Sequence, residues 1–377
     1  MKQDKLFPVY VLVFLILFLI GIHMLKKKFL QKAIPTPQLF VSEDYQPTPV
    51  SEENKKTITW IIHMYPPVHN AGAEWMAHAM NRFLIEKAGF KVNVILPYFP
   101  MKNFEGVNII QFSETKRIET AIRNSSVVLS HLSFSRNTIR TCAKVKRPCV
   151  LVIHNHEQGP LLNTAKQMIS GKNLHLVHNS IWIQQLYSSL SYNSIVVYPP
   201  VSWKEYRTNT SKKYVTLINL NKNKGGRVLI EIAKQMPNVE FLAVKGGYDI
   251  QIIDERIPNI KYVPNTPKIK EIYAKSQIIL MPSKEESWGR VAVEAMASGI
   301  PVIAHPTPGL KEACSYAGLF ADRNNIQEWV NLIYRLKTDA GYYKKQSDLA
   351  FKRAQELEPT PQLQKLSTWL QEIQWKQ

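Results

Sequence analysis

From residue 57 onward, short apolar runs alternate with segments that have helical periodicity. Runs of this length are typical of strands that are buried on both faces of a parallel sheet. The helical segments between them supply the crossovers that parallel strands need. The first series has expected strands at residues 57–64, 91–96, 107–112, 126–129, 148–153, 174–178 and 194–198. The alternation therefore predicts an α/β protein.

The pattern is interrupted at Tyr198-Pro199-Pro200 and then begins again. The second series has expected strands at residues 215–219, 240–245, 260–262, 278–281 and 302–303. We predict two Rossmann-like, doubly wound domains, over residues 57–198 and 199–340, that face each other across a cleft. Residues 341–377 are expected to be helices that pack back towards the first domain. A ligand should lie in the cleft, at the carboxyl ends of the strands.

The N-terminal segment is expected to be a transmembrane anchor, over residues 1–28. Residues 6–25 are nearly uncharged and apolar, which is long enough to span a bilayer. Neither the shorter apolar core nor the small-residue cleavage site of a signal peptide is evident. The positive-inside rule places the C-terminal part in the cytosol, because the segment is followed by Lys26, Lys27, Lys28 and Lys32. Possible glycosylation sites at Asn124 and Asn209 leave a lumenal orientation open.

Residues 29–56 separate this anchor from the first expected strand. They contain Pro35, Pro37, Pro47 and Pro49 among polar and acidic residues, with little hydrophobic periodicity. Such a composition is typical of a tether. We therefore predict a flexible linker.

The chain is strongly basic, with a formal net charge of +19. This charge favours anionic partners such as nucleotide phosphates, an anionic membrane face or nucleic acid, although an ordinary solvated surface is the alternative. No basic motif with interleaved aromatic residues is present, so we predict no nucleic-acid partner. The three cysteines have neither a disulfide nor a metal-ligand spacing, which favours a reducing compartment. No Asp-x-Asp motif occurs, and no metal site is predicted.

Residues 281–303 combine a strand, a glycine-containing turn and a helix. The first N–H groups of a helix have no helical partners, and the helix dipole favours an anion there, so this arrangement suits a nucleotide. Glu294 lies about one turn inside the helix, where its two oxygens suit the hydroxyls of a ribose. Glu286, in the preceding loop, can reach a second polar group of the same ligand.

Three further positions have chemistry that fits this cleft. Lys224 lies in a loop that follows a strand and opens a helix, so a lysine, backbone donors and a dipole converge on a phosphate. Gly72 lies in a similar loop of the first domain, where it lets the backbone approach a ligand. His154 directly follows a strand. No third ligand accompanies His154 and His156, so a hydrogen-bonding histidine is preferred to a metal ligand, and a structural histidine is the alternative.

The segment from Glu286 to Pro301 resembles the signature of family 4 glycosyltransferases, which have the GT-B fold. The matching residues are Glu286, Trp288, Gly289, Glu294, Ala295, Met296, Ala297, Gly299 and Pro301. The similarity extends over about residues 57–335 and includes Lys224-Gly225, His154-Asn155 and Pro308-Gly309 with Glu312.

The resemblance implies a role for each of the candidate residues. Lys224 would hold the donor diphosphate and stabilise the leaving nucleotide. Glu294 would bind the ribose. Glu286 would bind the transferred sugar, and His154 would contact it, which makes Glu286, Lys224 and His154 the catalytic set. The backbone at Ser287, Trp288 and Gly289 would assist, and Gly72 would approach the donor from the first domain.

The resemblance also implies the reaction. A hexose-type sugar would move from a UDP- or GDP-sugar to a glycan, a lipid-linked or a protein acceptor, with retention of configuration. No metal or other cofactor would be required, and a donor phosphate oxygen would take the proton of the acceptor.

The sequence departs from the family pattern at the donor site. Family members commonly have an arginine five residues before the lysine, and here that position is Asn219. In the first domain, Ala71 stands where a glycine is usual. These differences keep a second hypothesis open, in which the chain is a non-catalytic subunit that binds a nucleotide sugar or glycan for a glycosylation complex.

Overall fold

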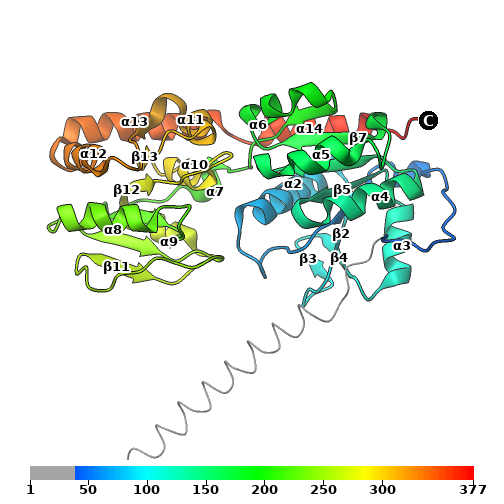
Figure 1. The fold of residues 1–377 in the computed structure, drawn as a ribbon, viewed down its shortest axis with the longest axis horizontal. Coiled ribbons are helices and arrows are strands. Elements are labelled where there is room, and N and C mark those ends of the chain that lie inside the picture. Colours follow the sequence, from blue (N-terminus) through cyan, green and yellow to red (C-terminus); the bar gives the residue numbers. More distant parts are fainter. Residues whose placement is uncertain (1–38) are drawn as a thin grey trace, which may run out of the picture.

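The computed structural model describes residues 39–377, which form two α/β domains (Figure 1). The N-terminal domain contains an eight-stranded sheet in the order β3-β4-β2-β1-β5-β6-β7-β8. All neighbouring strands are parallel except β3 and β4. The strands are β1 (Thr57–Ile61), β2 (Lys91–Leu96), β3 (Asn103–Phe104), β4 (Val107–Gln111), β5 (Val127–His131), β6 (Cys149–Ile153), β7 (Leu174–His178) and β8 (Asn193–Val196).

Helices cover both faces of this sheet. One face is covered by α3 (Thr115–Arg123), α4 (Ser135–Val145), α5 (Gly159–Ala165) and α6 (Ile181–Leu186). The other face packs against α2 (Gly72–Ala88) and a helix from the far end of the chain. Both faces of β1 are buried, as the continuous apolar run predicted, and Trp60 lies opposite Val94 and Leu129 in the neighbouring strands.

The C-terminal domain repeats the arrangement with six parallel strands in the order β11-β10-β9-β12-β13-β14. Its strands are β9 (Tyr214–Ile218), β10 (Phe241–Val244), β11 (Ile260–Val263), β12 (Ser276–Met281), β13 (Val302–Ala304) and β14 (Gly318–Phe320). Its helices are α7 (Trp203–Tyr206), α8 (Gly226–Gln235), α9 (Ile269–Tyr273), α10 (Arg290–Met296), α11 (Pro308–Cys314), α12 (Ile326–Thr338) and α13 (Ala340–Glu356). Short 3-10 helices lie at Glu52–Asn54, Leu132–Phe134, His156–Gln158, Gly171–Asn173, Ser188–Leu190 and Ser315–Ala317.

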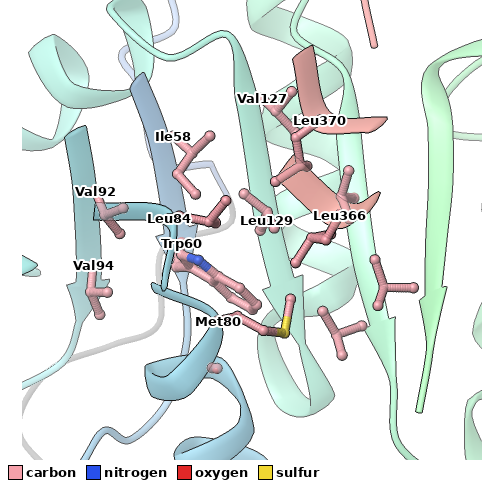
Figure 2. Close-up of a cluster of buried hydrophobic side chains, with 14 of the residues drawn as sticks. Ile58, Trp60, Met80, Leu84, Val92, Val94, Val127, Leu129, Leu366 and Leu370 are labelled. Carbon is pink, nitrogen blue, oxygen red and sulfur yellow. The ribbon is translucent and has the colours of Figure 1, made fainter. Parts of the chain in front are cut away.

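The last helix, α14 (Thr360–Glu372), returns to the N-terminal domain and packs on α2. Its apolar residues Leu366 and Leu370 lie with Trp60, Met80 and Leu129 in the same buried cluster (Figure 2). Helix α13 instead packs on α10 and α12 of the C-terminal domain. The two C-terminal helices therefore belong to different domains, and the chain crosses between the domains twice.

Most expected strands have observed counterparts, with shifted ends. The expected strand at residues 57–64 ends at Ile61, and β9 begins at Tyr214. The sequence patterns did not indicate β3, β14, α3, α5, α6, α7, α11, α12 or the 3-10 helices. Strands β3 and β14 have only two and three residues, which is too short for a periodic signal.

The predicted flexible linker over residues 29–56 is wrong for its described part. Phe40 and Tyr45 are buried, and the centroids of the Phe40 and Phe112 rings are 5.2 Å apart. Arg147 donates a hydrogen bond of 2.7 Å to the Thr48 carbonyl. Two aromatic residues are too few to produce a periodic pattern, but they bury enough apolar surface to hold this segment across α3 and α4.

The predicted membrane anchor lies outside the described residues, as does the beginning of the predicted linker. Between residues 39 and 377, no helix is both long enough and apolar enough to cross a bilayer.

The substitution Leu366→Ala tests the packing of α14 on the N-terminal domain. Leu366 is fully buried, so its truncation should reduce the free energy of unfolding by about 2–5 kcal/mol through lost burial and a residual cavity. Calorimetry should show a lower Tm for the transition of the N-terminal domain. Thr368→Ala, at an exposed position of the same helix, should change stability by less than about 0.5 kcal/mol. An unchanged Tm in Leu366→Ala would contradict this packing.

Candidate functional site

The carboxyl ends of strands from both sheets meet at the interface between the domains. Asn70, in the loop after β1, donates hydrogen bonds of 3.2 Å to the Asn265 side chain and 3.4 Å to the Thr266 carbonyl. These two residues lie in the loop that follows β11. Most of the candidate residues lie in the loops at this interface. Gly72 is the first residue of α2, Gly289 directly precedes α10, and Glu294 lies within α10.

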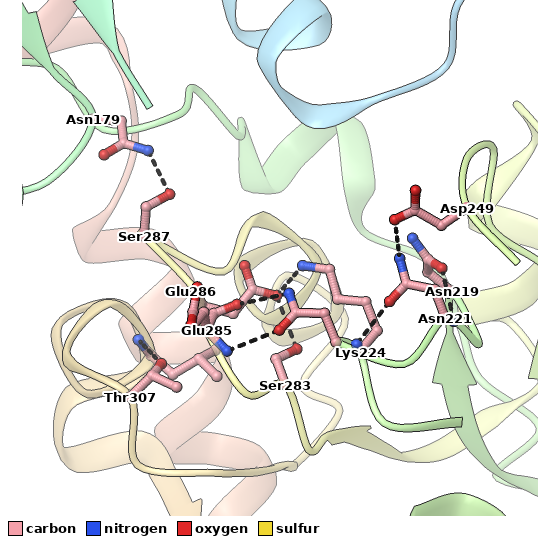
Figure 3. Close-up of polar contacts among 12 residues, drawn as sticks. Asn179, Asn219, Asn221, Lys224, Asp249, Ser283, Glu285, Glu286, Ser287 and Thr307 are labelled. Atoms are coloured by element: carbon pink, nitrogen blue, oxygen red, sulfur yellow. Dashed lines mark hydrogen bonds and ion pairs between the residues drawn. The ribbon is translucent and has the colours of Figure 1, made fainter. Parts of the chain in front are cut away.

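Lys224 and Glu286 form an ion pair at this interface (Figure 3). Ser283 donates a hydrogen bond of 3.0 Å to the same carboxylate oxygen of Glu286. The Lys224 and Glu286 side chains are only 20% and 12% exposed. Burial by itself lowers the pKa of Lys224, but Glu286 and Tyr248 outweigh it and hold that pKa above its usual value. Lys224 is therefore a partly buried, permanent positive charge.

The loop that positions Lys224 is held by short polar contacts. The Lys224 backbone N–H donates a hydrogen bond of 2.8 Å to the Asn221 side chain, which donates one of 3.2 Å to Asp249. Gly225 has a φ of 91°, and a Cβ there would lie 2.6 Å from Pro282 Cγ, so only glycine fits. This contact places the Lys224 loop directly against the loop that contains Glu286.

Asn219 is part of the same polar network. It has a φ of 70°, and its side-chain oxygen accepts hydrogen bonds from the Asn221 backbone N–H (3.2 Å) and Gln251 Nε2 (3.3 Å). Gln251 Oε1 in turn accepts hydrogen bonds from the backbone N–H groups of Leu220 (2.8 Å) and Gly246 (2.7 Å). Asn219 therefore orders the loop through an amide network. Sequence reasoning missed Gln251 because it is 32 residues away along the chain.

Glu294 has a different environment from the one expected for a ribose-binding carboxylate. One oxygen accepts a hydrogen bond of 2.7 Å from the Tyr273 hydroxyl, and the other pairs with Arg290 Nε at 2.5 Å. Arg290 also donates a hydrogen bond of 2.6 Å to the Tyr206 hydroxyl. Among the described residues, no hydrogen bond or ion pair joins Glu294 to Lys224 or Glu286. A ribose would therefore have to share a carboxylate that the protein already uses.

Trp288 packs at the hinge between the domains. It is buried, and its ring stacks on the Tyr198 ring at 3.9 Å between centroids and 14° between planes. Gly289 has a φ of 108°, and a Cβ there would lie 2.6 Å from Leu310 Cδ2. The expected donor contacts at these two positions are therefore limited to the backbone.

Ser287 connects the Glu286 loop to the N-terminal domain. Its hydroxyl accepts a hydrogen bond of 2.8 Å from Asn179, as Figure 3 shows, and its carbonyl accepts one of 2.7 Å from Trp182 Nε1. Asn179 also donates a hydrogen bond of 3.0 Å to the His154 carbonyl. The loop with Glu286 and the loop with His154 are thus linked through one asparagine side chain.

Glu312 forms a second connection between the domains. Its carboxylate accepts hydrogen bonds from the backbone N–H groups of Ile181 (2.7 Å) and Trp182 (3.0 Å) at the start of α6. Glu312 belongs to α11, whose Gly309 lies against the backbone of Glu286: a Cβ at Gly309 would be 2.4 Å from the Glu286 carbonyl oxygen. The sequence showed Glu312 as part of a motif but assigned it no role.

On the N-terminal side, His154 and His131 form a buried pair. His154 Nε2 lies 2.9 Å from His131 Nδ1. Burial lowers the pKa of His154 to about 4 and the pKa of His131 well below its usual value, so both are neutral at pH 7. Across residues 39–377, no three His, Cys, Asp or Glu side chains gather in a metal-binding arrangement.

Gly72 begins α2, and a Cβ there would meet no atom within 4 Å. Packing within the described chain therefore leaves the space beside Gly72 open.

Comparison with known proteins finds similarity mainly in the C-terminal domain of the chain. Residues 201–353 match the family model described as "Glycosyl transferases group 1". The chain is 31% identical over 130 residues to an uncharacterized glycosyltransferase of Haemophilus influenzae, which is 31% of this chain and 36% of that protein. It is 26% identical over 266 residues to an uncharacterized glycosyltransferase of Methanocaldococcus jannaschii, which is 65% of this chain and 75% of that protein.

The complete fold also has solved counterparts. The structure of Anabaena HepE in complex with UDP-glucose superimposes with a TM-score of 0.68 at 16% identity, covering 83% of this chain and 98% of that chain. This similarity shows the GT-B fold with two Rossmann-like domains. The match to the Haemophilus influenzae relative spans only about a third of that protein, as its 36% coverage shows.

The buried histidines should make folding stability depend on pH. Burial lowers the pKa values of His154 and His178 to about 4, so below about pH 6.5 the unfolded chain binds more protons than the folded chain. Stability should therefore fall as the pH is lowered from about 6.5 to 4.

The substitution His178→Gln should make this fall shallower, by up to about 1.4 kcal/mol per pH unit for the one proton that it removes. Denaturant midpoints measured across this range check the slope, and measurements above pH 7 serve as the control. Identical slopes for the two proteins would contradict the pKa assignment.

The substitution Glu312→Ala tests the connection between the domains. It removes the acceptor of two backbone N–H groups, so the contact between α11 and the start of α6 should weaken by about 1–3 kcal/mol. The distribution of distances between spin labels on the two domains should broaden in Glu312→Ala. They should stay unchanged in Glu372→Ala, which alters an exposed carboxylate of α14. A narrow distribution in both variants would show that other contacts hold the domains.

Proposed function

We propose that this chain, whose residues 201–353 match the group 1 glycosyltransferases, transfers a hexose-type sugar from a nucleotide-diphosphate sugar with retention of configuration. The observation that carries the proposal is the partly buried ion pair between Lys224 and Glu286 at the carboxyl edge of the C-terminal sheet. Within the group, the motif around these residues favours family 4.

The ion pair supplies two functions that transfer requires. A donor diphosphate attracts Lys224, whose charge then stabilises the negative charge that develops on the departing nucleotide diphosphate. Glu286, released from Lys224 but still hydrogen-bonded by Ser283, accepts hydrogen bonds from hydroxyls of the transferred sugar. Lys224 provides the positive charge beside the diphosphate, so the proposal includes no metal.

Retention requires the acceptor to attack from the face that the leaving group occupies. A donor phosphate oxygen takes the proton of the acceptor hydroxyl, and the bond from the anomeric carbon to that phosphate breaks as the new glycosidic bond forms. His154 is neutral, so it exchanges hydrogen bonds with the sugar rather than pairing with the phosphates. The open space beside Gly72 accommodates the donor from the N-terminal side.

UDP-glucose is the first donor to test, because the similar fold of HepE was solved with UDP-glucose bound, and GDP-sugars form the second set. We propose that residues 6–25 anchor the enzyme in a membrane with its catalytic part in the cytosol. A membrane anchor favours a lipid-linked or other membrane-bound glycan over a soluble protein as the acceptor.

Two observations favour a second candidate function, that of a non-catalytic subunit that binds a nucleotide sugar or glycan. Asn219 replaces a charge with an amide that is engaged within the loop, and the Glu294 carboxylate already pairs with Arg290. Donor binding without transfer would distinguish this function from catalysis.

The substitutions Lys224→Ala and Glu286→Ala should each reduce kcat for sugar transfer by about 10²–10³, because each removes a preorganised group at the reacting centre. The measurement is transfer or donor hydrolysis with UDP-glucose and a panel of UDP- and GDP-sugars. Donor binding is followed in parallel by thermal shift, since a ligand that binds only the folded state raises its stability.

The matched control is Lys284→Ala, which removes an exposed lysine (71%) from the same loop as Glu286 and should retain activity. Full activity in both Lys224→Ala and Glu286→Ala would exclude the proposed mechanism. A thermal shift without turnover in the unmodified protein would support the binding subunit instead.

A further inference from the structure

The net positive charge of the N-terminal domain is concentrated in one half of it, because acidic residues are scarce there. Residues 57–123 contain seven basic and five acidic residues, whereas residues 124–203 contain seven basic residues and only one acidic residue, Glu157. One of these seven, Arg147, is buried and binds backbone carbonyls. Lys144 is half-buried and donates a hydrogen bond to the Glu43 carbonyl. The other five basic residues are exposed.

We define the basic face as the five exposed residues of this group. They are Arg136, Arg140, Lys146, Lys166 and Lys172. Arg136 and Arg140 lie one turn apart on α4, Lys146 caps its end, and Lys166 and Lys172 follow α5. Among the described residues, no Asp or Glu forms an ion pair with any of them. The five charges are therefore available to an external partner.

Contacts between the elements bring Arg136, Lys166 and Lys172 close together, and Arg140 and Lys146 follow Arg136 along α4. Helices α4 and α5 pack against each other on the same face of the sheet, and Figure 1 shows them side by side. The Arg136 guanidinium lies 4.0 Å from Met168 Sδ, next to the end of α5. A Cβ at Gly171 would lie 3.9 Å from Lys166 Cε, which brings Lys166 close to Lys172. Leu132, which is 37% exposed, adds an apolar side chain just before α4.

The first described residues of the chain are hydrogen-bonded to α4. The Phe40 backbone N–H donates a hydrogen bond of 3.1 Å to the Thr141 hydroxyl of α4, and Lys144 of α4 donates one to the Glu43 carbonyl. The apolar segment at residues 6–25 lies 14 residues, 26–39, before this point. Even fully extended, such a connection spans at most about 50 Å. A membrane that holds residues 6–25 is thus within reach of α4.

We infer that the basic face docks on the anionic surface of the bilayer in which residues 6–25 are anchored. Basic residues near an anionic leaflet are attracted by its surface potential, and this attraction falls off within a Debye length. The tether and the five charges act together, because a tether raises the effective concentration of the surface near α4. Docking would orient the domain interface relative to the membrane. The inference rests on the proposed anchor and not on the chemistry of sugar transfer.

The test uses the full chain in vesicles of phosphatidylcholine, with or without phosphatidylglycerol, that contain brominated lipids as quenchers. A fluorophore is attached at Gln167→Cys, which is exposed beside Lys166, or at Thr368→Cys on α14, which covers the opposite face of the sheet. The three native cysteines are buried and can remain. We expect quenching at position 167 only with phosphatidylglycerol, loss of this quenching when salt rises from about 0.1 to 1 M, and no quenching at position 368.

The charge variant combines Arg136→Gln, Arg140→Gln and Lys166→Gln in the Gln167→Cys background. Each basic residue near an anionic surface contributes about fivefold to binding, so the docking equilibrium should fall about a hundredfold, and quenching should drop to its level in neutral vesicles. The matched control removes the same charge from exposed positions of α13, through Lys344→Gln, Lys345→Gln and Lys352→Gln, and should dock normally. Circular dichroism verifies that both triple variants are folded.

Several results would overturn the inference. Quenching that is equal at positions 167 and 368, that is independent of phosphatidylglycerol, or that survives the charge variant would each exclude docking through the basic face. A label at position 167 that responds to DNA in solution but not to vesicles would assign the face to a soluble polyanion.

Discussion

The hydrogen bonds between Ser287 and the N-terminal domain are the interaction on which the site depends. Ser287 follows Glu286 directly, and it binds Asn179 through its hydroxyl and Trp182 through its carbonyl. The position of the Glu286 carboxylate is thereby linked to the position of the whole N-terminal domain. Glu312 adds a second link through the same segment of α6. A relative rotation of the domains would break these hydrogen bonds beside Glu286.

The hinge contains the buried Trp288 and the partly buried Tyr198. Trp288 stacks on Tyr198. The Tyr198 backbone N–H donates a hydrogen bond of 2.8 Å to the side-chain oxygen of Gln362 in α14, and the Tyr198 carbonyl accepts one of 3.1 Å from Gln362 Nε2. The two segments that connect the domains are thus hydrogen-bonded to each other. A motion of one domain relative to the other would have to change the Trp288–Tyr198 stack and the Tyr198–Gln362 hydrogen bonds at the same time. This favours a few discrete domain arrangements over continuous bending.

The charges of the molecule have two separate uses. Lys224 and Arg290 are partly buried in ion pairs with carboxylates, where the lower local dielectric makes each charge effective. The five residues of the basic face are exposed and form no ion pair within the described chain, and we infer that they act over the Debye length on a surface rather than on one ligand. The site and the basic face therefore respond differently to salt.

The sequence by itself determined the fold class, the alternation of elements and the loops that contain Lys224, Glu286 and His154. These features follow from local spacing, because apolar periodicity and glycine positions act within a few residues. The same local spacing placed Arg290 one turn before Glu294, a signal of the ion pair that the interpretation as a ribose site passed over.

Only the tertiary structure decided how these local elements are used. Tyr273 reaches Glu294, Gln251 reaches Asn219, and Tyr198 covers Trp288, and each partner comes from a distant part of the chain. The segment around Phe40 became part of a domain, because its two aromatic side chains found a buried surface that no local pattern describes. Burial and hydrogen bonding between distant residues depend on the folded geometry, and this is why the environment of each site residue could not be read from its neighbours in sequence.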